Sequence, residues 1–596
     1  MSSGRTWGRR HVPWYRRITR GHVGLAAVVV LLFLLLFFVI QASRANSSLR
    51  LAANQAEVLQ SQIVAGDDAS ARITLRQLQQ STARAADTTD GPMWKVGSKL
   101  PFIGKNIDAV QTVSQVTHDI ATDALPPVVA LSNQINLNTF SPKNGKINIA
   151  EIRKIAPSVK TATAALTAAQ KDLSGIDATS LLAPLRGPVE TIQDKVDNAQ
   201  SAAKSSNLAA ELLPTMLGGK GTRRYMLLIQ NNAEIRSTGG IPGSFAILKA
   251  KNGKLSMGEQ GALKDLPPFD EPVLKMTKNE STVFTPTLVT NLLDTTVTPD
   301  FPRTGEIVRA MVEKGLDLNV DGVISVDPVA LSYVLAGTGP VPVANGTLNQ
   351  YNAVPLLLNQ TYALQPDRDK QDDIFKVSAR AIFDVMKSGR GEPRLVIDGL
   401  VQAASENRLM VWSSHKDEQR RLLDSPLSGE LSGNGGKTPH VGMYIGDAAS
   451  TKMEYYLEYS TTLRSDRCLQ GGVQQLSTST ELTSTAPLKA ASLPVAVTGD
   501  GAYTPRGTMR LIIRFYSPYA GGFTDVRLDG KPQTVYADSH RGRNVTKVLL
   551  TLKPGRTYTI TTSMISGRNE PNDPVFSTTP GVQRTPNDVV VKSACS

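Results

Sequence analysis

The side chains best suited to chemistry are concentrated in residues 230–240. Three amides, one carboxylate and one guanidinium precede a pair of glycines there. Glycine lets a backbone bend sharply or approach a ligand closely, and backbone N–H groups turned in this way can hold an anion. The stretch therefore predicts a ligand-binding loop with six candidate residues: Asn231, Asn232, Glu234, Arg236, Gly239 and Gly240.

The same composition also fits a loop that serves only its own structure. Asn side chains commonly cap turns through hydrogen bonds to nearby backbone groups. Glu234 and Arg236 are close enough in sequence to pair with each other. Sequence spacing does not separate this interpretation from the ligand-binding one.

A second set of charged residues opens a predicted amphipathic helix within 362–389. Carboxylates followed by cations on the next helical turns can hold a magnesium-bound phosphate. The alternative is a helix start capped by Asp, with a solvated charged face. The candidate metal ligands are Asp369, Asp372 and Asp373, Mg²⁺ is the cofactor they would suit, and the candidate phosphate ligands are Arg368 and Arg380.

The sequence gives little support to other functional classes. It has no G-x-S-x-G or H-E-x-x-H motif, and its six histidines show no ligand spacing. The net charge of +13 includes six arginines within residues 1–22. No zinc-finger spacing and no basic run interleaved with aromatics accompanies that charge, so we expect no nucleic-acid partner.

The predicted elements around the first stretch indicate a core domain at 222–425. Apolar strands at 225–229 and 245–250 frame the loop, and a buried strand at 322–326 is followed by an Asp-Pro helix start. Helices and strands alternate across the region, which favours an α/β or α+β domain.

The N-terminal segment predicts a membrane anchor. Residues 23–42 form an apolar run of the ~20 residues that a spanning helix needs. The arginines before it place 1–22 in the cytoplasm as a basic tail and the chain after about residue 43 outside the cell. The alternative is a cleaved signal peptide, whose apolar core is normally shorter, roughly 7–15 residues. We expect a single-pass protein of the cell membrane, with its bulk extracytoplasmic.

Residues 45–215 are expected to form a helical stalk or bundle. Apolar residues recur there every three or four positions, which is typical of helices packed on one another. We expect Pro157 in the first turn of its helix, where its missing N–H is harmless. The segments 87–104 and 137–146 are expected to be loops.

The C-terminal part alternates apolar and polar residues between turn signals, which predicts a β-sandwich at 438–566 and an irregular tail at 567–596. Its two cysteines, Cys468 and Cys595, are the only ones in the chain. A disulfide between them is plausible outside the cell, and two free thiols are the alternative. The expected fold class is thus multidomain: transmembrane helix, helical stalk, α/β core and β-sandwich.

The segment 230–255 resembles the signature of the domain of unknown function 4012 family. That signature is an N-N-x-E-[IL]-R-x-x-G-G run followed by a strand and an N-G-K turn. Three further passages resemble the same proteins: 92–104, 300–308 and 321–341. The resemblance covers most of residues 23–425, and it names a family without an assigned activity.

The order of elements is also similar to that of the LytR-CpsA-Psr family. These membrane-anchored enzymes transfer glycopolymers from a polyprenyl-pyrophosphate carrier to the cell wall. Lys264 and Asp265 lie where that family has an Arg-Asp pair, and an Arg-Ser pair at 236–237 lies where it has an Arg-Ser-Asp-Thr run. Thr238 and a double glycine replace its Asp, and lysine lacks the two-pronged hold of arginine on phosphate.

These observations lead to three hypotheses about function. The first is an envelope protein that binds a phosphorylated or lipid-linked glycan, such as a polyprenyl pyrophosphate or cell-wall glycan, in its core domain. The resemblance adds Lys264 and Asp265 to the ligand-binding candidates. The second is a magnesium-dependent glycopolymer phosphotransferase. The third is a non-catalytic scaffold whose helical and β-rich regions bind other envelope proteins.

Overall fold

The computed structural model divides the chain into two units. Unit 1 comprises Met1–Asn136 and Arg153–Glu211, and unit 2 comprises Leu137–Ile152 and Leu212–Ser596. The residues that the structure describes are 20–130, 142–143, 145–343, 346–423, 425–431, 436–536, 538–583 and 588–595. The predicted basic tail at 1–22 therefore lies almost wholly outside them.

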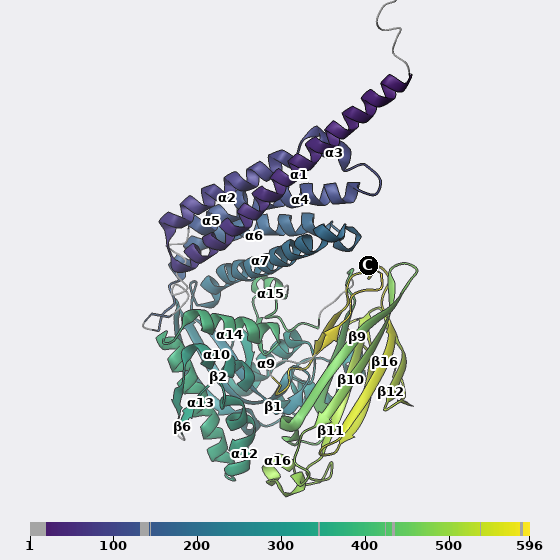
Figure 1. Cartoon of the computed structure of the whole chain (residues 1–596). Helices are drawn as coiled ribbons and strands as arrows, with labels where there is room; N and C mark the ends of the chain where they lie inside the picture. The colour runs from purple at the N-terminus through teal and green to yellow at the C-terminus, as the bar shows by residue number, and fades with distance from the viewer. Residues whose placement is uncertain are drawn as a thin grey trace, which may run out of the picture. The chain divides into compact units, whose positions relative to one another are not determined.

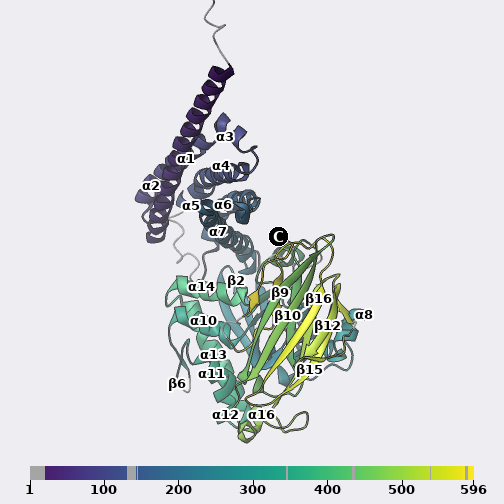
Figure 2. The same cartoon turned by 45° about the vertical axis from the view of Figure 1, so that its right-hand side comes forward.

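Unit 1 is helical, and its long helices run alongside one another (Figures 1 and 2). Alanine-rich seams let the helices approach closely. One apolar cluster joins Ala52 and Leu59 of α1 to Leu75 of α2, and another joins Val113 of α4 to helices α6 and α7. The elements are α1 (Arg20–Ala65), α2 (Asp68–Thr89), α3 (Pro92–Gly97), α4 (Gly104–Asp119), a π-helical turn (Ile120–Ala124), α5 (Leu125–Ala130), α6 (Ile149–Ser174) and α7 (Ala183–Met216).

The structure contradicts the prediction of a transmembrane helix at 23–42. That run is the beginning of the longer helix α1, which continues to Ala65. In the described part of the chain, no helix combines the length and the apolarity that crossing a membrane requires. The side chains before residue 36 lie outside the description.

Two details of unit 1 also differ from the sequence expectations. Pro157 lies inside α6, beyond its first turn, because the rest of that helix packs its apolar seam regardless of one missing N–H. The expected loop at 87–104 contains the short helix α3, which begins with Pro92 at its first position, where proline is well tolerated. The expected loop at 137–146 lies largely outside the described residues.

Unit 2 contains a five-stranded mixed sheet in the order β3-β2-β1-β4-β7. Strand β1 pairs antiparallel with β2 and parallel with β4, so the sheet is of mixed α/β type. Its strands are β1 (Arg223–Arg236), β2 (Gly239–Lys251), β3 (Lys254–Ala262), β4 (Gly322–Val326) and β7 (Leu409–Ser413). The buried strand predicted at 322–326 matches β4.

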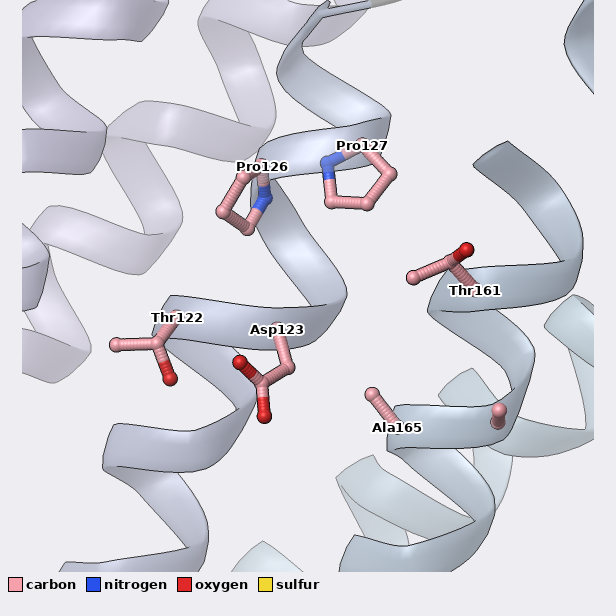
Figure 3. A pocket seen from close by; sticks show the side chains of 7 residues that line it. Thr122, Asp123, Pro126, Pro127, Thr161 and Ala165 are labelled. Atoms are coloured by element: carbon pink, nitrogen blue, oxygen red, sulfur yellow. The ribbon is translucent and has the colours of Figure 1, made fainter. Parts of the chain in front are cut away.

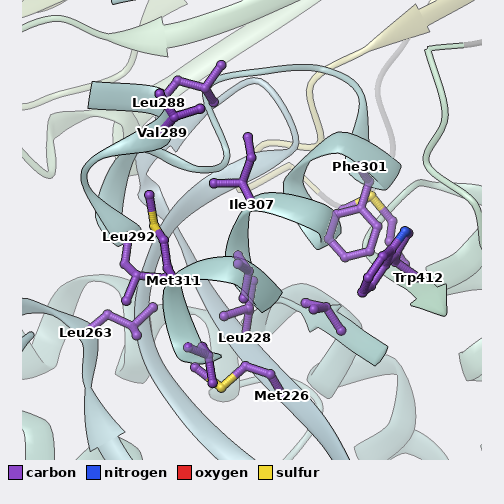
Figure 4. Close-up of a cluster of buried hydrophobic side chains, with 14 of the residues drawn as sticks. Met226, Leu228, Leu263, Leu288, Val289, Leu292, Phe301, Ile307, Met311 and Trp412 are labelled. Carbon is purple, nitrogen blue, oxygen red and sulfur yellow. The ribbon is translucent and has the colours of Figure 1, made fainter. Parts of the chain in front are cut away.

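Helices cover both faces of this sheet. On one face, Met226 and Leu228 of β1 pack against Ile307 and Met311 of α9 (Phe301–Leu316), together with Trp412 of β7 (Figure 4). On the other face lie α10 (Pro328–Thr338) and α14 (Pro393–Ser405). Neighbouring residues of a strand point to opposite faces of its sheet. Val323 and Met410 accordingly pack on the face with α9, and Val326 and Leu409 pack on the face with α10 and α14. The other helical elements are α8 (Lys278–Val283), α11 (Ala353–Pro355), α12 (Thr361–Leu364), α13 (Arg368–Ser388) and α15 (Lys416–Leu423).

The C-terminal region of unit 2 is a β-sandwich. Its sheets have the orders β13-β12-β16-β10-β9-β18 and β14-β15-β11-β8-β17, and apolar residues from both, such as Leu482 and Phe515, fill the space between them. The main strands are β8 (His440–Asp447), β9 (Leu457–Leu469), β10 (Val473–Ser484), β11 (Met509–Tyr519), β12 (Gly522–Leu528), β15 (Arg543–Leu552) and β16 (Thr557–Ile565). The short strands are β13 (Lys531–Pro532), β14 (Asp538–His540), β17 (Val575–Thr578) and β18 (Val589–Val590), and a separate hairpin pairs β5 (Val341–Val343) with β6 (Gly346–Leu348).

The tail at 567–596 is less irregular than we predict from its Pro- and Asn-rich sequence. Strand β17 pairs parallel with β8, and strand β18 pairs parallel with β9. Cys468 at the end of β9 forms a disulfide with Cys595. The last described residues are therefore attached to one edge of the sandwich by a covalent bond as well as by backbone pairing.

Candidate functional site

The stretch 230–240 is the closed end of the β1–β2 hairpin and not a loop. Strand β1 continues through the amide-rich run to Arg236, and β2 begins at Gly239, so only two residues connect the strands. Register shifts between Ile229 and Gln230 and between Asn231 and Ile235 bulge the hairpin there. Bulges redirect side chains next to a sheet. The ligand-loop interpretation did not anticipate that both strands would extend this far.

The two glycines are required by packing within the hairpin. Gly239 has a φ of +132°, and a Cβ there would lie 2.6 Å from the Gln230 Oε1. A Cβ on Gly240 would lie 2.1 Å from the Asn231 carbonyl oxygen. The Gly240 N–H, which could have faced an anion, donates instead to the Gln230 Oε1 at 2.7 Å. The positive φ and the nearby Gln230 side chain therefore explain Gly239, and close approach to the Asn231 backbone explains Gly240.

Both asparagines of the signature are buried and hydrogen-bonded. The Asn231 Nδ2 donates to the Tyr362 hydroxyl at 2.7 Å, and the Ala233 N–H donates to the Asn231 Oδ1 at 3.0 Å. The Asn232 Nδ2 donates to the Asp327 Oδ2 and to the Pro580 carbonyl, both at 2.9 Å. Asn232 thus joins the α/β sheet to a segment near the C-terminal end of the chain.

Arg408 completes this contact. Its Nη1 donates to the Asp327 Oδ2 at 3.0 Å and to the Gly581 carbonyl at 2.7 Å, its Nε donates to the Glu406 Oε2 at 2.6 Å, and its Nη2 donates to the Gln583 carbonyl. The Arg408 side chain is 1% exposed. Asp327 also caps α10 by accepting from the Ala330 N–H at 2.7 Å. One carboxylate therefore connects the start of a helix, the signature and the C-terminal segment.

A buried charged cluster lies at the end of β1. The Arg236 side chain is 9% exposed, with its Nη2 3.4 Å from the Glu234 Oε1 and its Nη1 3.9 Å from the Asp447 Oδ2. The Lys452 Nζ lies 3.2 Å from the Glu234 Oε2 and 4.8 Å from the centroid of the Tyr362 ring. Burial raises the pKa of Asp447 to about 6, although the nearby Arg236 guanidinium opposes this shift. The cluster joins the hairpin to strand β8 and the segment after it.

Glu454 is a buried carboxyl group beside this cluster. The residue is buried, and neither carboxyl oxygen has a hydrogen bond to another described residue. Burial, reinforced by the Asp447 carboxylate, raises the pKa of Glu454 well above its ordinary value. Folding therefore favours the neutral form of Glu454 over its charged form.

Neutralising Glu454 permanently should stabilise the protein at neutral and alkaline pH. Below its ordinary pKa of 4.5, Glu454 is protonated in both the folded and the unfolded protein and costs no stability. As the pH rises from there towards the raised folded-state pKa, the unfolded chain loses this proton first, so the free energy of unfolding falls. We expect Glu454→Gln to increase the free energy of unfolding by about 1–3 kcal/mol at pH 8 and to change it little at pH 4.5. Urea unfolding between these pH values measures the difference.

The matched control for this prediction is Glu458→Gln, because Glu458 is an exposed residue of β9. Its effect should stay within about 0.5 kcal/mol at every pH, as is usual for surface substitutions. An equal stability difference between Glu454→Gln and the wild type at pH 4.5 and pH 8 would contradict the role given to ionisation.

The second predicted group makes contacts of its own within unit 2. The Lys264 Nζ pairs with the Asp372 Oδ2 at 2.7 Å, and Arg380 donates to the Met257 and Gly258 carbonyls at 2.8 and 3.0 Å. These contacts hold α13 against strand β3. Arg236 pairs with Glu234 and Asp447, whereas Lys264 pairs with Asp372.

The start of α13 follows the alternative interpretation of its acidic residues. Asp367 is the N-cap and accepts from the backbone N–H groups of Asp369 and Lys370. Asp369, Asp373 and Arg368 are exposed, as is Asp265. The described residues contain no group of three or more His, Cys, Asp or Glu side chains that could hold a metal ion. Of the predicted metal ligands, Asp372 pairs with Lys264, and Asp369 and Asp373 are exposed at the start of α13.

Two hollows of the described structure lie away from the signature. One, of about 550 Å³, opens between α5 and α6 of unit 1 and is lined by Thr122, Asp123, Pro126, Pro127, Thr161, Ala164 and Ala165 (Figure 3). The other, of about 360 Å³, lies in unit 2 beside Phe269, Asp270 and Glu271. Lys314 and Phe269 both line this second hollow, and the Lys314 Nζ lies 5.3 Å from the centroid of the Phe269 ring. No predicted ligand-binding residue lines either hollow.

Several residues of the buried junction were missed by sequence reasoning. They are Asp327, Tyr362, Arg408, Asp447, Lys452 and Glu454. Asp327 carried the one usable signal, because an Asp-Pro pair after a strand predicts a capped helix start. The others come from distant segments without a motif.

The fold and the junction define a protein in which a mixed α/β sheet domain is joined to a β-sandwich through buried polar and charged side chains. Within it, residues 220–362 match the family described as "Protein of unknown function (DUF4012)". The resemblance predicted from the signature is therefore confirmed for this region. Comparison of the chain with curated proteins and with solved structures found no match, and the similarity to the LytR-CpsA-Psr family stays a prediction.

Proposed function

We propose that this protein is a non-catalytic scaffold of the cell envelope. In this proposal the DUF4012 region is the base on which the β-sandwich is held. The observation that carries the proposal is the use of the signature itself. The side chains of Asn231, Asn232, Glu234 and Arg236 are buried and engaged with other parts of the chain.

A phosphorylated ligand would have to open this junction before it could reach Arg236. Withdrawing that guanidinium would leave the buried Asp447 carboxylate without its neighbouring cation and would leave Glu234 with Lys452 alone. Removing one partner from a buried ion pair is strongly unfavourable. Binding at this place would therefore work against folding, which favours a structural role for the signature over a ligand-binding one.

The transferase alternative needs basic and acidic side chains that meet around one phosphate. Lys264 is paired with Asp372, and Arg380 is occupied by two backbone carbonyls. Arg236 belongs to a different group that faces β8. The arrangement therefore supports scaffolding more strongly than phosphoryl transfer.

A location outside the cytoplasm is part of the proposal. The Cys468–Cys595 disulfide supports it, since disulfides form and persist in oxidising compartments and are rare in the cytosol. Thiol labelling of the protein in intact cells, with and without prior reduction, tests this location. A fully reduced pair in freshly lysed cells would contradict it.

Replacing Arg236 separates the structural role from the ligand-binding one. We expect Arg236→Ala to lower the free energy of unfolding by about 1–3 kcal/mol, because Glu234 and Asp447 lose their shared cation. We also expect the full wild-type chain to show no saturable binding of a short-chain polyprenyl pyrophosphate by calorimetry, with or without Mg²⁺.

The matched control is Lys264→Ala, whose partly exposed ion pair should contribute no more than about 1 kcal/mol. Saturable pyrophosphate binding that disappears in Arg236→Ala, while the unfolding free energy stays unchanged, would establish a ligand site and overturn the proposal. Release of phosphate above a blank would favour the transferase instead.

A further inference from the structure

The turn from α3 into α4 carries exposed apolar side chains that the scaffold function does not use. The Phe102 residue is 98% exposed and Val96 is 66% exposed, and Leu100 and Ile103 are also exposed. An isolated exposed apolar residue is ordinary, but a contiguous group marks a surface that contacts something apolar. This group lies within unit 1 and extends over 92–104.

The apolar surface continues onto helix α1. Trp94 of α3 is buried, its Nε1 donates to the Gln41 Oε1 at 2.9 Å, and its ring lies 4.7 Å from that of Phe38. These contacts fix α3 beside residues 36–41. Around them, α1 exposes four further apolar side chains: Leu36, Phe37, Val39 and Ile40. We call this combined surface the apolar cap.

The backbone around Phe102 holds its side chain away from the helices. Phe102 has a φ of +69°, in the left-handed region that a bulky residue rarely adopts. The turn is tight, because a Cβ on Gly104 would lie 2.3 Å from the Ser98 carbonyl oxygen. Strained positions persist where the surrounding structure imposes them, and they are common where a protein contacts a ligand. Phe102 gains no burial from this conformation within unit 1.

Lysines predominate among the charged residues beside the apolar cap. Residues 92–105 contain three lysines and no Asp or Glu. Lys95, Lys99 and Lys105 are exposed, and only Lys95 forms an ion pair with a described residue, at 3.0 Å from Asp90. Projecting apolar side chains with lysines beside them suit the boundary between acyl chains and anionic headgroups.

We propose that the apolar cap lies in the interface of an anionic lipid bilayer. Phe102 and its apolar neighbours enter the boundary of the acyl chains, and the three lysines contact headgroup phosphates. This contact is with the surface of a bilayer and involves no spanning segment. It goes beyond the scaffold function by naming the surface on which unit 1 rests.

An environment-sensitive fluorophore at position 102 tests the proposal in the full chain. The two native cysteines are joined in a disulfide, so Phe102→Cys provides a single labelling site. We expect a blue shift and a several-fold rise in emission when vesicles of phosphatidylcholine with 30% phosphatidylglycerol are added. We expect a much smaller change with phosphatidylcholine alone, and a decrease as salt screens the lysines.

The matched control places the same fluorophore at Leu182→Cys. Leu182 is 58% exposed in unit 1 but lies ahead of α7, so its emission should not respond to vesicles. An equal response at positions 102 and 182 would overturn the proposal, since it would report non-specific adsorption. No response at position 102 would overturn it as well.

Two substitutions test the chemistry of the contact through vesicle co-sedimentation of the full chain. Phe102→Asn keeps a residue that tolerates a positive φ, and we expect it to weaken the anionic-vesicle affinity about tenfold, whereas Leu182→Asn should not. The pair Lys99→Glu and Lys105→Glu should weaken it further than the pair Lys195→Glu and Lys204→Glu on α7. A fluorescence change at position 102 that depends on protein concentration without vesicles, together with cross-linked dimers, would identify a second copy as the occupant and overturn the lipid assignment.

Discussion

Replacing Arg408 by alanine is expected to lower the free energy of unfolding by about 3–5 kcal/mol, the range for removing one partner of a buried ion pair. The Arg408 side chain has the Asp327 and Glu406 carboxylates and the Gly581 and Gln583 carbonyls as acceptors. All of these acceptors would lose a charged donor at once.

The largest part of this effect should come from Asp327. Its Oδ2 accepts from Arg408 and Asn232, and its Oδ1 caps α10 through the Ala330 N–H. Without Arg408 the carboxylate stays buried with neutral donors only. Burial disfavours the Arg408 charge, but Asp327, Glu406 and Tyr333 outweigh this and raise the Arg408 pKa. The charges of Arg408 and Asp327 therefore stabilise each other in the folded protein.

Urea unfolding measures the loss, and hydrogen exchange shows where it acts. The backbone of residues 580–583 should exchange faster in Arg408→Ala, because two of its carbonyls are held by the lost guanidinium. Arg408→Lys should recover only part of the stability, since an ammonium cannot reproduce the planar fork.

The matched control is Arg394→Ala on α14, where the Arg394 and Asp398 side chains are both mostly exposed. Its effect should not exceed about 0.5 kcal/mol. A loss of stability in Arg408→Ala that is no larger than in Arg394→Ala would show that the buried network is dispensable. Unchanged hydrogen exchange at 580–583 in Arg408→Ala would show that Arg408 does not hold that segment in place.

Local patterns predicted much of unit 2, because strand periodicity and helix starts are short-range signals. The apolar run 322–326 and the following Asp-Pro pair correspond to β4 and the capped start of α10. The hairpin was recognised from its two apolar ends but its closed end was not, because Gln230, Asn231 and Asn232 have low strand preference. There, burial against α10 and the β-sandwich decides the backbone conformation.

Local patterns failed where a longer context decides the outcome. The apolar run 23–42 predicted a membrane-spanning helix by its length and composition, but in the described structure it is the beginning of the longer α1. Pro157 predicted a helix start, although α6 begins at Ile149. In both cases a window of the sequence was interpreted without the rest of the helix that contains it.

The candidate site could be located from the sequence, but its role could not. The signature predicted that 230–240 is important, and polar groups there could have bound a ligand or one another. Asn232 and Pro580 are 348 positions apart, and no spacing rule connects residues at that separation. Asp327, Arg408 and the C-terminal segment decide that these polar groups bind one another. Only folding brings these residues to the hairpin.

Removing the disulfide is the second change with a large expected effect. We expect the double variant Cys468→Ser/Cys595→Ser to lose about 2–4 kcal/mol of unfolding free energy, the usual range for a native disulfide. The bond joins residues 127 positions apart, and the chain-entropy model gives about 5 kcal/mol for a loop of that length as an upper value. The wild type treated with a reductant should match the double variant.

The physical reason is that this segment is otherwise held by a two-residue strand and by separate hydrogen bonds, such as those of the Val591 and Ala594 N–H groups to the Leu463 carbonyl and the Ser465 Oγ. Strand β18 is only Val589–Val590, and the Asp588 Oδ1 accepts from the Thr461 N–H at 2.7 Å. Residues 588–595 should therefore exchange hydrogen much faster after reduction. Equal stability and equal exchange in oxidised and reduced protein would show that these contacts hold the segment without the covalent bond.

Arg408 and the disulfide hold neighbouring parts of the C-terminal region by different means. Arg408 fixes residues 581 and 583 against the α/β domain, and Cys595 fixes the following residues to β9. Because the two contacts share no residue, their losses should add to within about 0.5 kcal/mol in the combined variant. A combined loss well below that sum would mean that releasing one contact already releases the other, and that residues 580–583 and 588–595 detach together.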